Sequence, residues 1–281
     1  MNSNQSGTLY VVATPIGNLG DMVPRAVEIL QTVKAIACED TRHSKKLLDH
    51  FRIDTPLMAY HDHSDKKSSH KILTQLSAGN DIALISDAGT PLISDPGYRL
   101  VLAARQQGIN VIPVPGACAA IAALSVAGLP TDRFRFVGFL PAKSTQRKKV
   151  LQELAAVPET VVFYEAPHRI LDTLKDSVEV FGAEHSGFIA RELSKTFETY
   201  LHGTLAELVS IVEADSNQQR GEIVLVLAGR EETESTVTVD GERVLRLLLA
   251  ELPTAKAAAL TAKITGGDKK QFYQMALALK D

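Results

Sequence analysis

The stretch ALISDAGTPLISDPG, residues 83–97, decides the fold of this chain. A short apolar run ends at Asp87, and two Pro/Gly turns follow it. Small residues and prolines directly after a strand let the backbone approach a ligand closely. Two other stretches, VVATPIGNLGD at 11–21 and VIPVPGACAAIAAL at 111–124, repeat the order of apolar run, Pro/Gly turn and helical pattern. Three strand ends of this kind predict one cleft that is lined mostly by backbone.

Apolar runs and helical patterns alternate through the first half of the chain. The expected strands are 8–14, 35–39, 81–87 and 110–115, and the helical patterns between them lie near 24–32, 44–51, 67–78 and 98–107. Alternation with nearly continuous apolar strands predicts a mostly parallel sheet. Ligands bind such sheets outside the carboxyl ends of the strands, where the three turn motifs fall. We therefore expect an N-terminal α/β domain over residues 1–117.

The pattern changes after residue 117. Five further strands are expected, at 134–140, 160–166, 187–192, 198–203 and 222–228. Several have short polar connections, so we predict a second α/β domain with a mixed sheet over 118–229. A charged segment at 230–239 suits a linker. The tail, 240–281, has helical periodicity with a Gly-Gly break, which predicts a helix-turn-helix-like extension.

Composition limits the class of protein and its partners. The 281 residues are 45% hydrophobic and 22% charged, which is typical of a globular chain of about two domains. The formal net charge of −3 means that any nucleic-acid contact must use local basic patches. Cys38 and Cys118 share no CxxC spacing, so we expect two reduced thiols and a cytoplasmic location. We expect no secretory signal and no membrane span, which needs about 20 apolar residues.

Several charged clusters follow the expected strands, and each has two readings. CEDTRHSKKLL at 38–48 suits phosphate binding at a helix start, or else a solvated helix whose acids favour the dipole. YEAPHRI at 164–170 and ARELSKTFE at 190–198 mix acids and bases, either for function or as ion pairs between domains. HDHSDKK at 61–67 is weak evidence for a metal, so we expect a polar rim there and no metal.

Basic residues gather in two places where they could attract RNA. One is the loop AKSTQRKKV at 142–150, and the other is the tail. The alternative is that both are ordinary surface helices. If RNA is the partner, the candidate contacts are Lys143, Arg147, Lys148, Lys149, Lys269 and Lys270, and binding should depend on salt.

The motifs together resemble the tetrapyrrole methylase superfamily, whose members bind S-adenosylmethionine between two α/β domains. TPIGNLGD, EDTRHS, DAGTPLISDPG, VPGACAA, YEAPHR, ARELSKTFE and GEIVLVLAG occur in the family's order over about residues 8–229. The resemblance is strongest to a branch that methylates the ribose 2′-hydroxyl of a decoding-centre cytidine in 16S ribosomal RNA, and the helical tail is similar to that branch's C-terminal extension. It implies a homodimer, and a substrate that lies within the small ribosomal subunit.

The resemblance also implies a set of cofactor contacts in the cleft between the domains. They are Pro15, Asp87, Ala88, Gly89, Ile93, Ala117, Cys118, Phe163, Tyr164 and Gly221. The family's usual Gly-Asp-Pro turn reads Gly-Thr-Pro in this chain.

For a ribose acceptor, the sequence offers candidate bases at two strand ends. We expect Glu165 or Asp40 to take the hydroxyl proton, with His168 as a relay. Phosphates would be oriented by Arg42, Lys45, Arg169, Arg191 and Lys195. Two other functions stay open: a methyltransferase that acts on a tetrapyrrole or another small molecule, and a non-catalytic RNA-binding protein of ribosome assembly.

Overall fold

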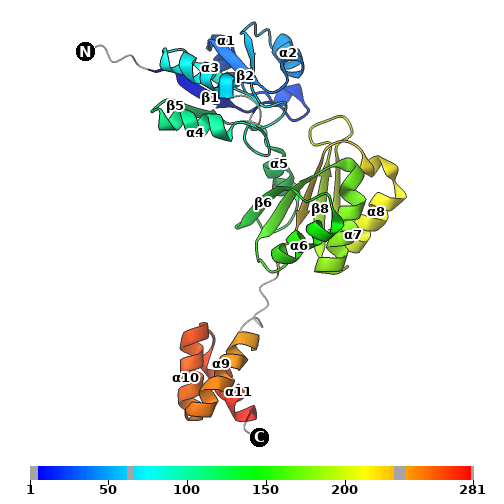
Figure 1. Cartoon of the computed structure of the whole chain (residues 1–281). Helices are drawn as coiled ribbons and strands as arrows, with labels where there is room; N and C mark the ends of the chain where they lie inside the picture. The colour runs from blue at the N-terminus through cyan, green and yellow to red at the C-terminus, as the bar shows by residue number, and fades with distance from the viewer. Residues whose placement is uncertain (1–5, 62–65, 231–237, 280–281) are drawn as a thin grey trace, which may run out of the picture. The chain divides into compact units, whose positions relative to one another are not determined.

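The computed structural model describes residues 6–61, 66–230 and 238–279 (Figure 1). The chain divides into two compact units, Met1–Gly229 and Arg230–Asp281. The first unit contains both β-sheets, and the second contains a helical tail.

The first sheet is parallel and has the strand order β3-β2-β4-β1-β5. Its strands are β1 (Thr8–Val12), β2 (Ala35–Cys38), β3 (Leu57–Ala59), β4 (Ile82–Leu84) and β5 (Asn110–Val114). Its helices are α1 (Pro24–Thr32), α2 (Thr41–His50), α3 (Lys66–Ser77) and α4 (Tyr98–Gln106). Along β2, Ile36 and Cys38 pack with α1 and α2, while Ala35 and Ala37 pack with α3 and α4. Helices therefore cover both faces of the sheet, and the carboxyl ends of its strands meet at one edge.

The second sheet is mixed, with the order β6-β7-β10-β8-β9. Its strands are β6 (Phe134–Phe139), β7 (Thr160–Glu165), β8 (Ser186–Arg191), β9 (Thr199–Thr204) and β10 (Ile223–Leu227), and only β6 and β7 pair in parallel. The helices are α5 (Ala119–Val126), α6 (Ser144–Leu154), α7 (Ile170–Phe181) and α8 (Leu205–Ala214). Alternate side chains of β10 pack into two separate hydrophobic cores. Leu225 packs with α6, α7 and α8, and Val224 packs with α5. Short 3₁₀ turns are η1 (Leu19–Asp21), η2 (Pro167–Arg169) and η3 (Ser216–Gln219).

The tail unit is helical throughout its described residues. It consists of α9 (Thr238–Glu251), α10 (Thr254–Thr265) and α11 (Lys269–Ala278) (Figure 1). These helices share a small core that includes Leu245 and Phe272. Gly266 ends α10 in a left-handed conformation, with φ of 76°. The Asp268 carboxylate caps α11 by accepting from the backbone N–H groups of Lys270 and Gln271.

The predicted α/β class, the parallel first sheet, the mixed second sheet and the helical extension are confirmed. The sequence did not predict β3, whose apolar run Leu57–Ala59 is short and is not fully buried. The division at residues 117 and 118 stays a prediction, and most of the proposed linker 230–239 lies outside the described residues. No described helix has the length and hydropathy that a membrane span requires.

Candidate functional site

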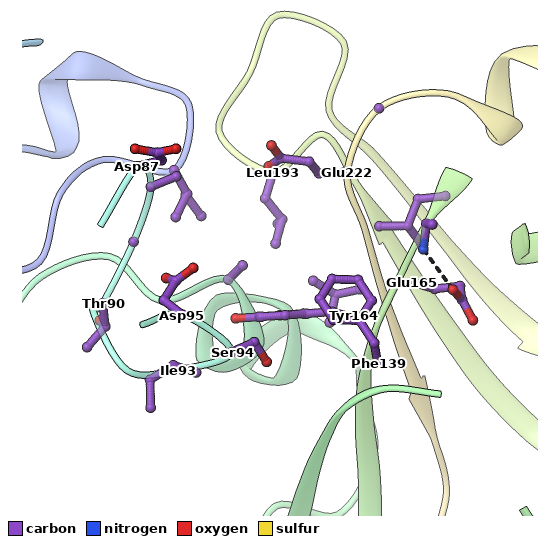
Figure 2. Close-up of a pocket in the computed structure, with 18 of the residues that line it drawn as sticks. Asp87, Thr90, Ile93, Ser94, Asp95, Phe139, Tyr164, Glu165, Leu193 and Glu222 are labelled. Carbon is purple, nitrogen blue, oxygen red and sulfur yellow. Dashed lines mark hydrogen bonds between the residues drawn. The ribbon is translucent and has the colours of Figure 1, made fainter. Parts of the chain in front are cut away.

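A cavity of 390 Å³ lies at the carboxyl ends of strands from both sheets (Figure 2). That volume is within the roughly 300–1,000 Å³ of small-molecule sites. The first sheet contributes Ile16, after β1, and the loop 87–95, after β4. The second sheet contributes Phe139 at the end of β6, residues 164–167, Leu193, and residues 221–224 at the start of β10.

Hydrogen bonds tie the three turn motifs of the sequence together beside this cavity. Gly89 exchanges two backbone hydrogen bonds with Thr14, with N–O distances of 2.9 and 3.0 Å. The Thr90 hydroxyl donates to the Ala117 carbonyl at 2.9 Å. Gly89 has φ of 77°, and a Cβ there would lie 3.2 Å from Cγ2 of Ile16. The predicted convergence of the three strand ends is therefore confirmed, and Gly89 is needed both for its conformation and for the close approach.

Two loops that border the cavity hold non-glycine residues in left-handed conformations. In the first loop, Leu92 and Ser94 have φ of 72° and 64°, and in the second, Glu192 and Ser194 have φ of 54° and 59°. Such conformations cost about 1–3 kcal/mol each and persist where surrounding structure holds them, commonly at ligand sites. The Ser194 hydroxyl accepts from the backbone N–H of Asn18 at 3.1 Å, which joins the second loop to the first sheet.

Most of the predicted cofactor contacts border the cavity. These are Asp87, Ala88, Gly89, Ile93, Tyr164 and Gly221. Pro15, Ala117, Cys118 and Phe163 are not among its lining residues. The Phe163 side chain is fully buried in the core beneath α6, α7 and α8, so it does not face the cavity.

Other lining residues were not predicted, although most lie inside the quoted motifs. Ile16 belongs to TPIGNLGD, Asp95 to DAGTPLISDPG, Leu193 to ARELSKTFE and Glu222 to GEIVLVLAG. Phe139 lies in no motif, and its position at the end of an expected strand was the one signal available.

The charges around the cavity suit a cationic ligand. Its lining includes the carboxylates of Asp87, Asp95 and Glu222, and none of the described residues that line it is a lysine, an arginine or a histidine. The donor that the resemblance implies carries a sulfonium and an ammonium group beside one carboxylate. Apolar residues such as Ile16, Ile93, Leu193 and Val224 supply surface for its adenine ring. The cavity therefore fits S-adenosylmethionine in size, charge and polarity.

Two titratable groups in the cavity are perturbed by burial. Burial, together with the nearby charges of Glu39 and Asp87, raises the pKa of Asp95 to about 6, and a hydrogen bond from Ser86 opposes this shift. Burial also raises the pKa of Tyr164 well above its ordinary value, so its hydroxyl stays protonated at neutral pH. Figure 2 shows both side chains reaching into the cavity, Asp95 from the first loop and Tyr164 from β7.

Glu165, a predicted base, borders the cavity but turns its carboxylate away from it (Figure 2). Its side chain is 0% exposed, and Arg169 Nε lies 3.3 Å from one oxygen. The carboxylate accepts from the Ala166 N–H at 2.8 Å and from the Thr173 hydroxyl at 2.7 Å. This network occupies both oxygens, so the expectation that Glu165 takes a substrate proton is corrected: the residue is placed to hold η2 against β7.

Asp40 and His168, the other catalytic candidates, are exposed and do not line the cavity. Asp40 caps α2 by accepting from the N–H groups of Arg42 at 2.8 Å and His43 at 3.2 Å. These backbone hydrogen bonds lower the pKa of Asp40, which makes it a weaker base. His168 lies in η2 on the protein surface.

The predicted RNA-binding residues fall into two groups. The first group is on the surface and comprises Arg42, Lys45, Lys143, Lys149, Lys269 and Lys270, with Lys148 and Lys195 partly buried. Lys45 pairs with Asp49 at 2.5 Å and Lys148 with Glu179 at 2.6 Å, and both pairs remain solvent-accessible. Lys195 lies 2.8 Å from Glu192 and 3.2 Å from Glu222.

The second group is engaged in contacts within the protein: Arg147 and Arg191 are buried and Arg169 is partly buried, which corrects the expectation that these arginines bind phosphates. Arg147 is buried and pairs with Asp176 at 2.7 Å. Arg191 is buried and donates to the Phe197 carbonyl and the Thr199 hydroxyl, both at 2.9 Å. Arg169 pairs with Glu165 and donates to the Leu140 carbonyl at 2.6 Å. Each guanidinium therefore has partners within the protein that hold a loop or helix in place.

No group of three or more histidine, cysteine, aspartate or glutamate residues in the described chain is arranged to hold a metal ion. His61 is described, but Asp62 and His63 lie outside the described residues. Both cysteines are free thiols.

Known proteins of similar fold include methyltransferases of tetrapyrrole substrates. A uroporphyrin-III-C-methyltransferase from Thermus thermophilus superposes with a TM-score of 0.57 at 20% identity, over 79% of this chain and 94% of that one. A cobalt precorrin-4 methyltransferase superposes with a TM-score of 0.59 at 14% identity, over 79% of this chain and 94% of that one. At these identities, the likeness shows a shared fold.

Sequence comparison extends the match to the whole chain. A Pseudomonas aeruginosa protein named "Ribosomal RNA small subunit methyltransferase I" is 57% identical over 97% of both chains. An Escherichia coli O157:H7 protein of the same name is 51% identical over 98% of this chain and 96% of its own. Residues 235–280 match the family described as "RsmI C-terminal HTH domain". Residues 8–209 match the family described as "Tetrapyrrole (Corrin/Porphyrin) Methylases", and the chain therefore belongs to the tetrapyrrole methylase family.

Proposed function

We propose that this protein is an S-adenosylmethionine-dependent methyltransferase of 16S ribosomal RNA. The observation that carries the proposal is the likeness to the ribosomal RNA methyltransferases, which includes the tail: 97% of this chain aligns with the Pseudomonas aeruginosa protein at 57% identity. The tetrapyrrole enzymes of similar fold cover only 79% of the chain. This difference favours RNA over a tetrapyrrole as the substrate.

The finer proposal is methylation of the ribose 2′-hydroxyl of a decoding-centre cytidine, within the small ribosomal subunit. It rests on the resemblance of the motifs to the branch with that activity. By the same resemblance we propose a homodimer. A cytoplasmic location suits a ribosomal substrate and the two free thiols.

Methyl transfer to a hydroxyl depends mainly on alignment. S-adenosylmethionine supplies an activated methyl group on sulfur, and its leaving group is neutral. The protein's part is to hold the acceptor oxygen in line, and positioning of this kind can contribute roughly 7–11 kcal/mol. The loop 87–95, fixed by the hydrogen bonds of Gly89 and Thr90, gives the cavity a rigid wall against which the donor would be placed.

Binding of a long RNA needs contacts outside the cavity. The exposed lysines of the predicted set, including Lys143 and Lys149 in the second sheet's lobe and Lys269 and Lys270 in the tail, are suited to phosphates. The charged side chains among the described residues that line the cavity are all acidic, so the cavity would repel the RNA backbone and admit only the acceptor nucleoside. We therefore propose that the basic surfaces bind the RNA and that methyl transfer takes place in the cavity.

The decisive experiment is transfer of a radiolabelled methyl group to purified 30S subunits and to free 16S RNA that lack the modification, followed by mass spectrometry of RNA fragments. A single added methyl on one ribose supports the proposal. Transfer to a tetrapyrrole precursor but not to RNA would support the small-molecule alternative. RNA binding without transfer to any acceptor would support the assembly-protein alternative.

A further inference from the structure

We propose that Asp95 is the catalytic base that takes the proton from the acceptor hydroxyl. The proposal rests on the proposed function, since it assigns the proton-accepting residue of that reaction. It starts from the positions of the carboxylates around the cavity, because a base must reach the reacting oxygen directly or through one water.

Of the carboxylates that border the cavity, Asp95 is the one placed to accept a proton inside it. The Glu165 carboxylate is fully buried and already accepts hydrogen bonds from Ala166 and Thr173. Glu222 is 72% exposed and is paired with the Lys195 ammonium at 3.2 Å. Asp87 is exposed at the rim, whereas Asp95 is partly buried in the wall.

The backbone around Asp95 fixes its direction. Ser94, directly before it, has φ of 64°, and Gly97, two residues after it, has φ of 134°. A Cβ on Gly97 would lie 2.9 Å from side-chain atoms of Leu84 and of Leu92, so the loop is packed tightly against the end of β4. Strain held by tight packing is typical of residues whose orientation matters to a site.

The groups that face Asp95 come from three strand ends. Glu39 follows β2, Asp87 follows β4, and Tyr164 is the last but one residue of β7. The two acids raise its proton affinity, and no cationic side chain lines the cavity to lower it. A base with a pKa of about 6 is mostly ionised at neutral pH and still has appreciable affinity for a proton, which is the range that general-base catalysis favours.

In the proposed step, a methyl group moves from sulfur to the acceptor oxygen and the hydroxyl proton moves to Asp95. The acceptor oxygen forms a bond to the methyl carbon, and the carbon–sulfur bond breaks with its electron pair left on sulfur. The hydroxyl proton passes to the Asp95 carboxylate. The Tyr164 hydroxyl, which accepts from the Ala120 N–H at 3.3 Å, is protonated at neutral pH and does not compete for this proton.

The test is the single-turnover rate of methyl transfer to 30S subunits between pH 5 and 9, measured for the wild-type protein, Asp95→Asn and Glu39→Gln. For the wild type, we expect a rate that rises with pH and levels off above an inflection near 6. In Asp95→Asn the rate should fall by roughly 10²–10⁴-fold and the inflection should disappear. In Glu39→Gln the inflection should move to lower pH, because a negative neighbour has been removed.

A second readout, calorimetric binding of S-adenosylhomocysteine, separates proton transfer from cofactor binding. We expect Asp95→Asn to bind this product with an affinity within a few-fold of the wild type. If its rate loss is matched by an equal loss of affinity, Asp95 is a cofactor ligand and the proposal is overturned. An active wild type with an unchanged inflection in Asp95→Asn also overturns it, whereas a wild type that transfers no methyl to RNA refutes the proposed function itself.

Discussion

Replacing Asp176 with asparagine should destabilise the first unit strongly, because it leaves the Arg147 guanidinium buried without its counter-charge. The two side chains are 4% and 8% exposed and lie 2.7 Å apart. Asp176 also accepts from the Ser144 hydroxyl at 2.9 Å, which fixes the start of α6 against α7. Removing one partner of a buried pair typically costs about 3–5 kcal/mol. For a unit of this size, that corresponds to a fall in Tm of roughly 6–20 °C.

The assay is thermal unfolding followed by circular dichroism, with RNA affinity measured on each folded variant. Lys148→Met is the matched control, since Lys148 is 31% exposed and contacts the same carboxylate at 3.4 Å. Its loss should cost less than about 1 kcal/mol. The double replacement Arg147→Met with Asp176→Leu should regain most of the lost stability, because apolar groups of similar volume can replace a buried pair. If Arg147→Met kept the wild-type Tm and bound RNA tenfold more weakly, the assignment of Arg147 to the scaffold would be refuted.

Three further outcomes follow from the structure. Gly89→Ala should weaken binding of S-adenosylhomocysteine at least tenfold in calorimetry, because it strains a residue at φ of 77° beside Ile16. The control Gly128→Ala, at φ of 67° with open space around it, should bind like the wild type, and equal affinities of the two variants would contradict this prediction. Asp95→Asn should raise Tm relative to the wild type at pH 8 but not at pH 4. The pKa of Asp95 is about 6 in the folded protein and 3.8 in the unfolded chain, so the wild type loses stability as pH rises through 6. A Tm difference between the two proteins that is the same at both pH values would contradict this prediction. Phe272→Ala should destabilise the small tail core by about 3–5 kcal/mol and abolish hydrogen-exchange protection of α9, α10 and α11. Like deletion of 240–281, this variant should weaken RNA binding and leave cofactor binding unchanged. If both affinities fall equally, the tail is a scaffold.

Much of the fold could be predicted because its strands are continuous apolar runs that end in Pro/Gly turns. β1, β4 and β5 follow that pattern, and the hydrogen bonds of Gly89 and Thr90 bring their ends together as the turns indicated. β3 follows Pro56, has three residues and is only partly buried, so it gives no such signal.

The site was predicted less completely, since residue type does not reveal direction. Glu165 was expected to face substrate, but the alternation of side chains along β7 and the partners Thr173 and Arg169 hold it inside the protein. Arg147 was grouped with its basic neighbours, although it shares a helix face with Leu151 and Leu154, the other buried residues of α6. That spacing of four and seven residues was visible in the sequence and indicates burial.

The division of β10 between two cores limits how the chain can tolerate insertions. Ile223, Leu225 and Leu227 face one set of helices and Val224 and Val226 face α5, so a shift of one residue would exchange every side chain of this strand. The same shift would move residues 221–224 out of the cavity wall. A single residue inserted within β10 would therefore disrupt both the packing of this lobe and the wall of its ligand site.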